Sequence, residues 1–311
     1  INHLENKARL LASQPRHDTP FDPPYTTISV GHIEGGEATL TQEEIERCKD
    51  FFTAPNYATI DDKAAQAEVD AIAADNVAFE KWLSRNLCGH KIPGYVAVVL
   101  ALKPTGVAPG DVTDRQLDII ADLADKYSFG EARTTHDQNI VLAEVKKSEL
   151  FSLWQEAKAA GFATPNIGTL TDVICCPGGD FCSLANAKSI PIAEAIQRRF
   201  DDMDYVYDLG DIDLNISGCM NACGHHHVGH IGILGVDKKG KEFYQIQLGG
   251  DSSENTALGK VLGPAFGETD IPDIIAGILN VFVENRHDGE QFVETYNRIG
   301  LAPYKERAYA K

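Results

Sequence analysis

The sequence predicts an α+β protein, and three features lead to that prediction. Residues 92–162 alternate strand-like and helix-like segments in the order β-α-β-β-α, which is most of a ferredoxin-like unit. Residues 163–290 continue with strand-like segments separated by helical ones, as in an α/β domain. Residues 1–91 form an irregular and helical lead-in, and residues 291–311 predict a short helix and a C-terminal tail.

The lead-in closes with two helical patterns. The stretch LTQEEIERCKDFF carries Thr41 with Glu44 three residues later, and this capping box predicts that a helix begins there. Residues 61–87 are rich in alanine with apolar residues at helical spacing, so they predict one or two further helices.

The ferredoxin-like unit is read from hydrophobic spacing and from its Gly and Pro residues. Its predicted elements are a strand in 92–104, a helix in 112–128, two short strands in 130–145 and a helix in 146–162. Thr113 or Asp114 caps the first helix, and Gly161 closes the second.

The α/β region is read in the same way. Its predicted elements are a strand in 167–176, a helix in 189–202, a strand in 211–219, a hairpin in 230–250 and a helix in 270–286. PGGDF predicts a glycine-rich turn, Ser189 is the expected cap of the first helix, and the hairpin turns at DKKG.

Composition excludes several classes of protein. The formal net charge of −18 argues against a nucleic-acid partner, because phosphate binding needs a basic face. No run of 18 apolar residues occurs, so no membrane span is expected, and the first residues lack the layout of a signal peptide. Five of the seven cysteines lie in two short stretches, unlike a secreted disulfide framework. We therefore expect a metal site, a redox site or buried thiols in a reducing compartment, the cytoplasm.

The two cysteine stretches each hold a pair at the end of a predicted strand, followed by a glycine-containing turn. Cys176 and Cys182 form a C-x₅-C pair, and Cys219 and Cys223 form a C-x₃-C pair. Four thiolates from two loops bind either Zn²⁺ or an iron–sulfur cube, and the wider first pair favours the cube. The alternative is a buried set of thiols without a metal. Cys175 is expected in the core, because adjacent strand residues face opposite ways.

The histidines of GHHHVGH do not by themselves indicate a metal site. Three consecutive residues cannot all face one ion in regular structure. We expect them to line a pocket beside the cysteines and to donate hydrogen bonds to bound carboxylates.

Two motifs carry a family resemblance. CPGGDFC followed by SGCMNACGHHHVGHIG resembles the cluster-binding signature of the sirohaem-dependent sulfite and nitrite reductases. The upstream segment, from PGYVAVV to QNIVLAEV, resembles that family's ferredoxin-like half-domain, with an R-x-T-x-x-Q-N pattern. The likeness covers roughly residues 80–305, and within the family it is strongest to the bacterial assimilatory sulfite reductase haemoprotein.

The resemblance implies a ferredoxin-like half-domain followed by an α/β domain, residues 163–290, that binds a [4Fe–4S] cluster and sirohaem. The implied cluster ligands are Cys176, Cys182, Cys219 and Cys223, with Cys223 also the axial ligand of the sirohaem iron. Candidate sirohaem contacts are Arg133, Thr135, Gln138 and Asn139 by resemblance and Asn221 and His225 by proximity to the last ligand. The implied enzyme is an oxidoreductase that reduces sulfite to sulfide or nitrite to ammonia with six electrons.

The family is built from two such halves, and this sequence carries one copy of each module. The Arg and Lys residues that hold the substrate are therefore expected in an N-terminal half, and this chain alone is predicted to be an incomplete enzyme with an open, apolar face. Its other expected partner is an electron donor, either a ferredoxin or an NADPH-dependent flavoprotein. The alternatives are a haem-free [4Fe–4S] electron-transfer protein and a zinc-stabilised structural domain.

Overall fold

The structure, a computed structural model, describes residues 41–50 and 55–310. The chain divides into two units, residues 1–58 and residues 59–311. In the first unit, helix α3 (Gln42–Asp50) begins at the expected capping box: the Glu44 N–H donates to Thr41 Oγ1 over 3.2 Å, and the Thr41 N–H donates to the Glu44 carboxylate over 2.8 Å. The rest of the predicted lead-in before residue 55 lies outside the described residues.

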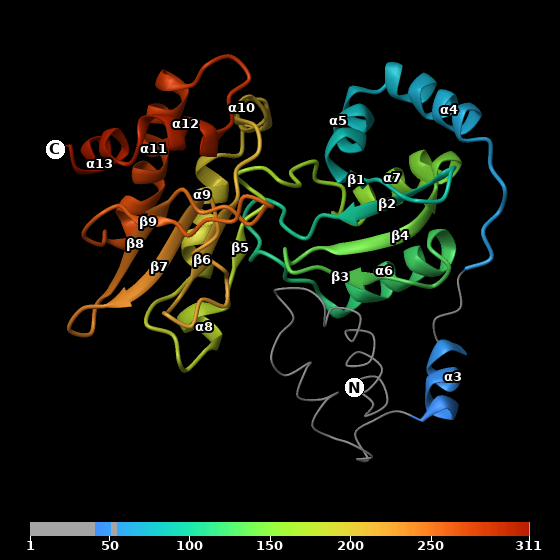
Figure 1. The fold of residues 1–311 in the computed structure, drawn as a ribbon, viewed down its shortest axis with the longest axis horizontal. Coiled ribbons are helices and arrows are strands. Elements are labelled where there is room, and N and C mark those ends of the chain that lie inside the picture. Colours follow the sequence, from blue (N-terminus) through green and yellow to red (C-terminus); the bar gives the residue numbers. More distant parts are fainter. Residues whose placement is uncertain (1–40, 51–54, 311) are drawn as a thin grey trace. The chain divides into compact units, whose positions relative to one another are not determined.

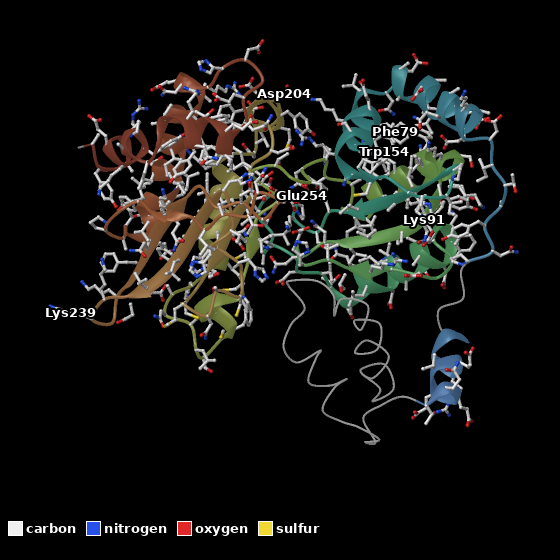
Figure 2. The ribbon with its side chains drawn as sticks, in the orientation of Figure 1. Phe79, Lys91, Trp154, Asp204, Lys239 and Glu254 are labelled. Carbon is white, nitrogen blue, oxygen red and sulfur yellow. The ribbon has the colours of Figure 1, made fainter. Side chains whose placement is uncertain are left out.

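The second unit opens with two helices. They are α4 (Asp62–Ala74) and α5 (Val77–Asn86), capped by the side chains of Asp61 and Asn76. Helix α5 buries Phe79 and Trp82, and the ring of Phe79 lies 5.4 Å from that of Trp154 (Figure 2). These helices, which the sequence assigned to the lead-in, thus share a core with the elements that follow them.

A four-stranded antiparallel sheet is the first of the two sheets in this unit (Figure 1). Its strands, in the order β1-β2-β4-β3, are β1 (Leu87–Cys88), β2 (Tyr95–Leu100), β4 (Ile140–Lys146) and β3 (Arg133–Thr134). Helix α6 (Asp114–Tyr127), the 3₁₀ turn η2 (Lys147–Glu149) and helix α7 (Leu150–Ala159) complete it. The order β2-α6-β3-β4-α7 is the predicted one. Thr113 caps α6 in a capping box, and Gly161 follows α7 with φ of +86°.

A second, five-stranded sheet carries the cysteine stretches. Its strands are β5 (Ile174–Cys175), β6 (Leu214–Ser217), β7 (Ile231–Asp237), β8 (Glu242–Leu248) and β9 (Lys260–Val261), in that order. Strands β5, β6 and β7 are parallel, and β8 and β9 run antiparallel to their neighbours. The predicted DKKG turn closes the β7–β8 hairpin, since Asp237 pairs with Glu242. Because parallel strands end at one edge of a sheet, the loops after β5 and β6 lie together.

Several helical elements accompany this sheet. They are α8 (Gly178–Phe181), α9 (Ile190–Arg199), α10 (Met203–Leu209), the 3₁₀ turn η3 (Glu268–Asp270), α11 (Ile271–Asn285), α12 (Phe292–Ile299) and α13 (Ala302–Tyr309). All of them except α8 and η3 supply residues to the apolar core of the sheet. Ile196 of α9 and Ile275 of α11 are fully buried with Ile233 and Ile246 of the sheet. In the described part of the chain, no helix is long and apolar enough to cross a membrane.

Three sequence expectations differ from the structure in detail. Residues 302–309 form helix α13 rather than a tail, because Tyr304 and Ala308, one turn apart, are buried against the core. The PGGDF turn is wound into the single helical turn α8. Strand β5 is only two residues long, since Thr169 bonds back to the Asn166 carbonyl and turns the preceding segment.

Gly232 in β7 offers a direct test of this packing. A Cβ at this position would lie 2.0 Å from the carbonyl oxygen of His226, a backbone atom that cannot move aside cheaply. We expect Gly232→Ala to lower the free energy of unfolding by about 3 kcal/mol or more. Chemical denaturation measures this loss. Gly89→Ala is the control, because a Cβ there meets nothing within 4 Å and should change stability by less than about 0.5 kcal/mol. Equal stability of the two variants would contradict the register of β7.

Candidate metal centre

The four candidate ligands lie on two loops that follow adjacent parallel strands. Cys176 directly follows β5, and its N–H donates to the Ile216 carbonyl of β6 over 3.0 Å. Cys182 ends helix α8, with its N–H bonded to the Gly178 carbonyl. Cys219 and Cys223 belong to residues 218–230, which connect β6 to its parallel neighbour β7 without a helix.

Direct hydrogen bonds join the two cysteine loops. The Gly218 N–H donates to Cys176 Sγ over 3.0 Å, and Ser189 Oγ lies 3.4 Å from the same sulfur. The Gly218 carbonyl accepts from the N–H groups of Asn186 and Ala187 over 2.9 and 3.0 Å. Ser189 therefore faces the first cysteine, where the sequence predicted a helix cap, and makes no capping bond. An amide donor aimed at sulfur is the contact that stabilises a metal-bound thiolate.

Glycines allow these loops to approach each other. A Cβ on Gly218 would lie 2.6 Å from the Ala187 carbonyl oxygen, and one on Gly224 would lie 2.0 Å from that of Ile216. A Cβ on Gly178 would likewise lie 2.4 Å from the Ser189 backbone nitrogen, so these three glycines are needed for close packing around the cysteines.

The cysteines differ in exposure. Cys176 and Cys219 are 9% and 8% exposed, Cys182 is half-buried and Cys223 is exposed. Among the residues that the structure describes, no three His, Cys, Asp or Glu side chains are gathered closely enough to hold a metal ion. Convergence of the four sulfurs on one centre therefore stays a prediction. The donor set, four thiols on two hydrogen-bonded loops with an N–H···S contact, fits an iron–sulfur cluster whose binding draws the ligands together.

Cys175 lies on the core side of β5. It is 3% exposed within the apolar cluster under the sheet, and burial raises the pKa of its thiol. Its position agrees with the strand alternation that separates it from Cys176.

The R-x-T-x-x-Q-N residues surround the β3–β4 hairpin. The guanidinium of Arg133 forms ion pairs with Glu131 and, over 3.4 Å, with the buried carboxylate of Glu144. Thr135 closes the hairpin, since its Oγ1 accepts from the Asn139 N–H over 3.1 Å. The Thr135 hydroxyl, a candidate sirohaem contact, therefore bonds the backbone of its own turn in this structure.

The other two residues of that pattern, Gln138 and Asn139, bond strand β5 and the segment that precedes it. The side-chain amide of Gln138 forms two hydrogen bonds of 2.7 Å with the backbone of Cys175. Asn139 accepts from the Leu102 N–H and donates to Asp172 Oδ1 over 3.0 Å. Asp172 also forms a buried ion pair of 2.7 Å with Lys103, which sequence reasoning missed because the two residues are far apart in the chain.

Asn221 and His225 lie in the second cysteine loop, and both are exposed. His225 has φ of +54° and borders a cavity of about 540 Å³, and its carbonyl accepts from the Asn215 amide. Polar lining residues of this cavity are His136, Asp137, Asp172, Asp213, Asn215 and Ser252. Among the described residues that line it, none is Arg or Lys, so it offers no permanent positive charge to an anionic substrate.

Large apolar side chains are exposed on the cysteine loops themselves. Phe181 is 79% exposed, Leu184 is 70% exposed and Met220 is 81% exposed. All three lie within two residues of a candidate ligand in the sequence. The open apolar face expected from the sequence stays a prediction.

Comparisons with known proteins agree with this architecture. Residues 96–160 match the nitrite/sulfite reductase ferredoxin-like half domain, and residues 168–310 match the nitrite and sulphite reductase 4Fe-4S domain. The "Sulfite reductase [ferredoxin] 1" of Mycolicibacterium paratuberculosis is 28% identical over 61% of this chain and 36% of its own length. The "Assimilatory ferredoxin-dependent nitrite reductase" of Haloferax mediterranei is 27% identical over 64% of this chain and 36% of its own length.

Solved structures show the same fold. The Mycobacterium tuberculosis NirA protein superposes with a TM-score of 0.57 at 25% identity, over 71% of this chain and 41% of that one. Dissimilatory sulfite reductase I superposes with a TM-score of 0.58 at 13% identity, over 85% and 89% of the two chains.

The two matched domains follow each other in this order, and the paired cysteine loops lie together at the ends of β5 and β6, an arrangement that places the chain among proteins with a nitrite and sulphite reductase 4Fe-4S domain. The chain belongs to the nitrite and sulfite reductase family. It spans a little over a third of the length of the curated relatives described above.

Proposed function

We propose that this chain is the cluster- and sirohaem-binding part of an enzyme that reduces sulfite to sulfide or nitrite to ammonia. Cys176, Cys182, Cys219 and Cys223 would hold a [4Fe–4S] cluster, and Cys223 would also be the axial ligand of the sirohaem iron. When bound, these two centres would pass the six electrons one at a time from the external donor to the substrate.

The N–H···S bond from Gly218 to Cys176 is the observation that carries this proposal. It ties the C-x₅-C loop to the C-x₃-C loop at one edge of the sheet, and it presents an amide proton to a sulfur that would carry negative charge. The exposure of Cys223 supports its proposed contact with sirohaem, because a thiol enclosed by protein could not reach a macrocycle.

The chain's own residues would then orient the sirohaem. Its carboxylates need hydrogen-bond donors and positive charge. Asn221 and His225 are exposed beside Cys223 and supply donors, and Arg133 supplies a guanidinium with 55% of its side chain exposed. The other three residues of the pattern already bond protein groups: these are Thr135, Gln138 and Asn139. They would contribute to sirohaem binding indirectly, by holding the β3–β4 turn and the segment that leads into β5.

Substrate binding would need a second part of the enzyme. The acidic lining of the 540 Å³ cavity suits neither sulfite nor nitrite, so we propose that a related N-terminal half supplies the Arg and Lys residues. A ferredoxin is the donor that the relatives' names favour. Thiolate ligands need a reducing compartment, and we place the protein in the cytoplasm.

A visible spectrum of the purified chain tests the proposal. We expect anaerobic reconstitution with iron and sulfide to give broad absorption that bleaches on reduction. Subsequent addition of sirohaem should give an intense haem band with a companion at longer wavelength. Cys223→Ser should abolish that haem spectrum, whereas Cys88→Ser, a control on the first sheet, should leave it unchanged. A cluster spectrum without sirohaem binding would indicate a haem-free electron carrier, and binding of zinc alone would indicate a structural domain.

A further inference from the structure

We propose that Gln138 is a positioning residue for the metal centre: its side-chain amide pairs with the Cys175 backbone and thereby sets the position of the Cys176 ligand. This role rests on the proposed function of Cys176. It replaces direct sirohaem contact as the main reason for a glutamine at this position of the R-x-T-x-x-Q-N pattern.

The amide of Gln138 acts like one residue of an additional strand. Its Oε1 accepts from the Cys175 N–H and its Nε2 donates to the Cys175 carbonyl, each over 2.7 Å. Strand β5 is the edge of the five-stranded sheet, so no further strand within residues 41–50 and 55–310 pairs with that side of Cys175. In a strand, the N–H and C=O of one residue point the same way, and the next residue's point oppositely. Cys175 therefore faces Gln138, while the Cys176 N–H bonds Ile216 of β6.

This pairing fixes the segment immediately before the first ligand from both sides. Strand β5 is two residues long, and a strand this short has little intrinsic resistance to fraying. With the Gln138 bonds, the backbone of β5 is held on one side by β6 and on the other by the β3–β4 hairpin. A small shift of Cys175 would move the Cys176 sulfur away from the Gly218 N–H and weaken the hydrogen bond between them.

Gln138 makes this contact from a backbone conformation that is unfavourable for a non-glycine residue. Gln138 has φ of +57°, a left-handed conformation that a non-glycine residue adopts only when its surroundings enforce it. Gly110, with φ of +83°, makes room, because a Cβ there would lie 3.0 Å from the Gln138 Cβ. The neighbouring Asn139 anchors the same hairpin to Asp172, which precedes β5. The hairpin thus has two independent attachments to the segment that leads into the ligand.

Gln138→Gly tests the inference, because glycine removes the amide and accepts the positive φ without strain. Lys239→Gly is the matched control: Lys239 has φ of +59°, is exposed, and lies at the tip of the β7–β8 hairpin (Figure 2). In the metal-free chain, NMR hydrogen exchange at the Cys175 amide should accelerate about tenfold or more in Gln138→Gly, from the loss of two hydrogen bonds. The Ile233 amide in β7 should be unchanged, and Lys239→Gly should alter neither amide.

The reconstituted chain provides the second measurement. Gln138→Gly should shift the midpoint potential and the electron paramagnetic resonance signal of the reduced cluster, and Lys239→Gly should reproduce the wild-type values. Unchanged exchange at Cys175 in Gln138→Gly, or equal acceleration at Ile233, would overturn the positioning role. If the wild-type chain takes up no cluster, the proposed function fails instead, and the exchange result still decides whether Gln138 holds β5.

Discussion

Replacing Cys176 with serine is expected to abolish iron–sulfur cluster binding. A serine hydroxyl stays protonated at neutral pH and is a poor ligand for the iron of a cluster, and it would also accept the Gly218 N–H less well in a site built for sulfur. Iron and sulfide in the reconstituted protein should fall to background, with loss of the broad visible absorption. Cys182→Ser, Cys219→Ser and Cys223→Ser should give the same loss.

The adjacent thiol provides the control for this series. Cys175 lies in the apolar core on the other face of β5, so Cys175→Ser should retain iron while lowering stability by about 1–3 kcal/mol. Retention of iron in Cys176→Ser together with loss in Cys175→Ser would show that the ligand register is wrong by one residue.

Replacing Lys103 with methionine is expected to cause the largest loss of stability outside the cluster loops. The Lys103 side chain is fully buried and its Nζ donates to Asp172 Oδ1 over 2.7 Å. Methionine keeps most of the volume but leaves the buried carboxylate of Asp172 with only the neutral donors Asn139 and Gly168. Removing one partner of a buried ion pair costs about 3–5 kcal/mol, and denaturation of the apo chain measures it.

A double substitution separates the buried charge from the packing. Lys103→Met with Asp172→Asn removes both charges, and the asparagine can still accept from Gly168 or Asn139. We expect the double variant to recover at least about 2 kcal/mol of the loss caused by Lys103→Met alone. Additive losses would mean that the two side chains do not interact as a pair. The outcome matters for the site, because Asp172 stands two residues before β5.

Short-range patterns predicted most of the fold. The Thr41–Glu44 cap, the DKKG turn and the order β2-α6-β3-β4-α7 depend on local spacing and local hydrogen bonds, which a sequence displays directly. Of the two caps expected for α6, Thr113 or Asp114, the structure has Thr113. Helix α13 was missed because its burial depends on contacts with α11, distant in the chain. Strand β5 was predicted too long because its apolar pattern continues through residues that turn instead.

The sequence by itself determined the cysteine spacing, the glycines around it and therefore the family and the candidate ligand set. Only the tertiary structure decided what the polar residues of the half-domain touch. Arg133 meets the buried Glu144, Gln138 meets the backbone of Cys175, and Asn139 meets Asp172 beside Lys103. These contacts join residues 11 to 69 positions apart, and a polar side chain has no preference for a partner until the backbone has folded around it. The candidate ligands can be predicted from local spacing, whereas the contacts that hold each candidate in place form only in the folded chain.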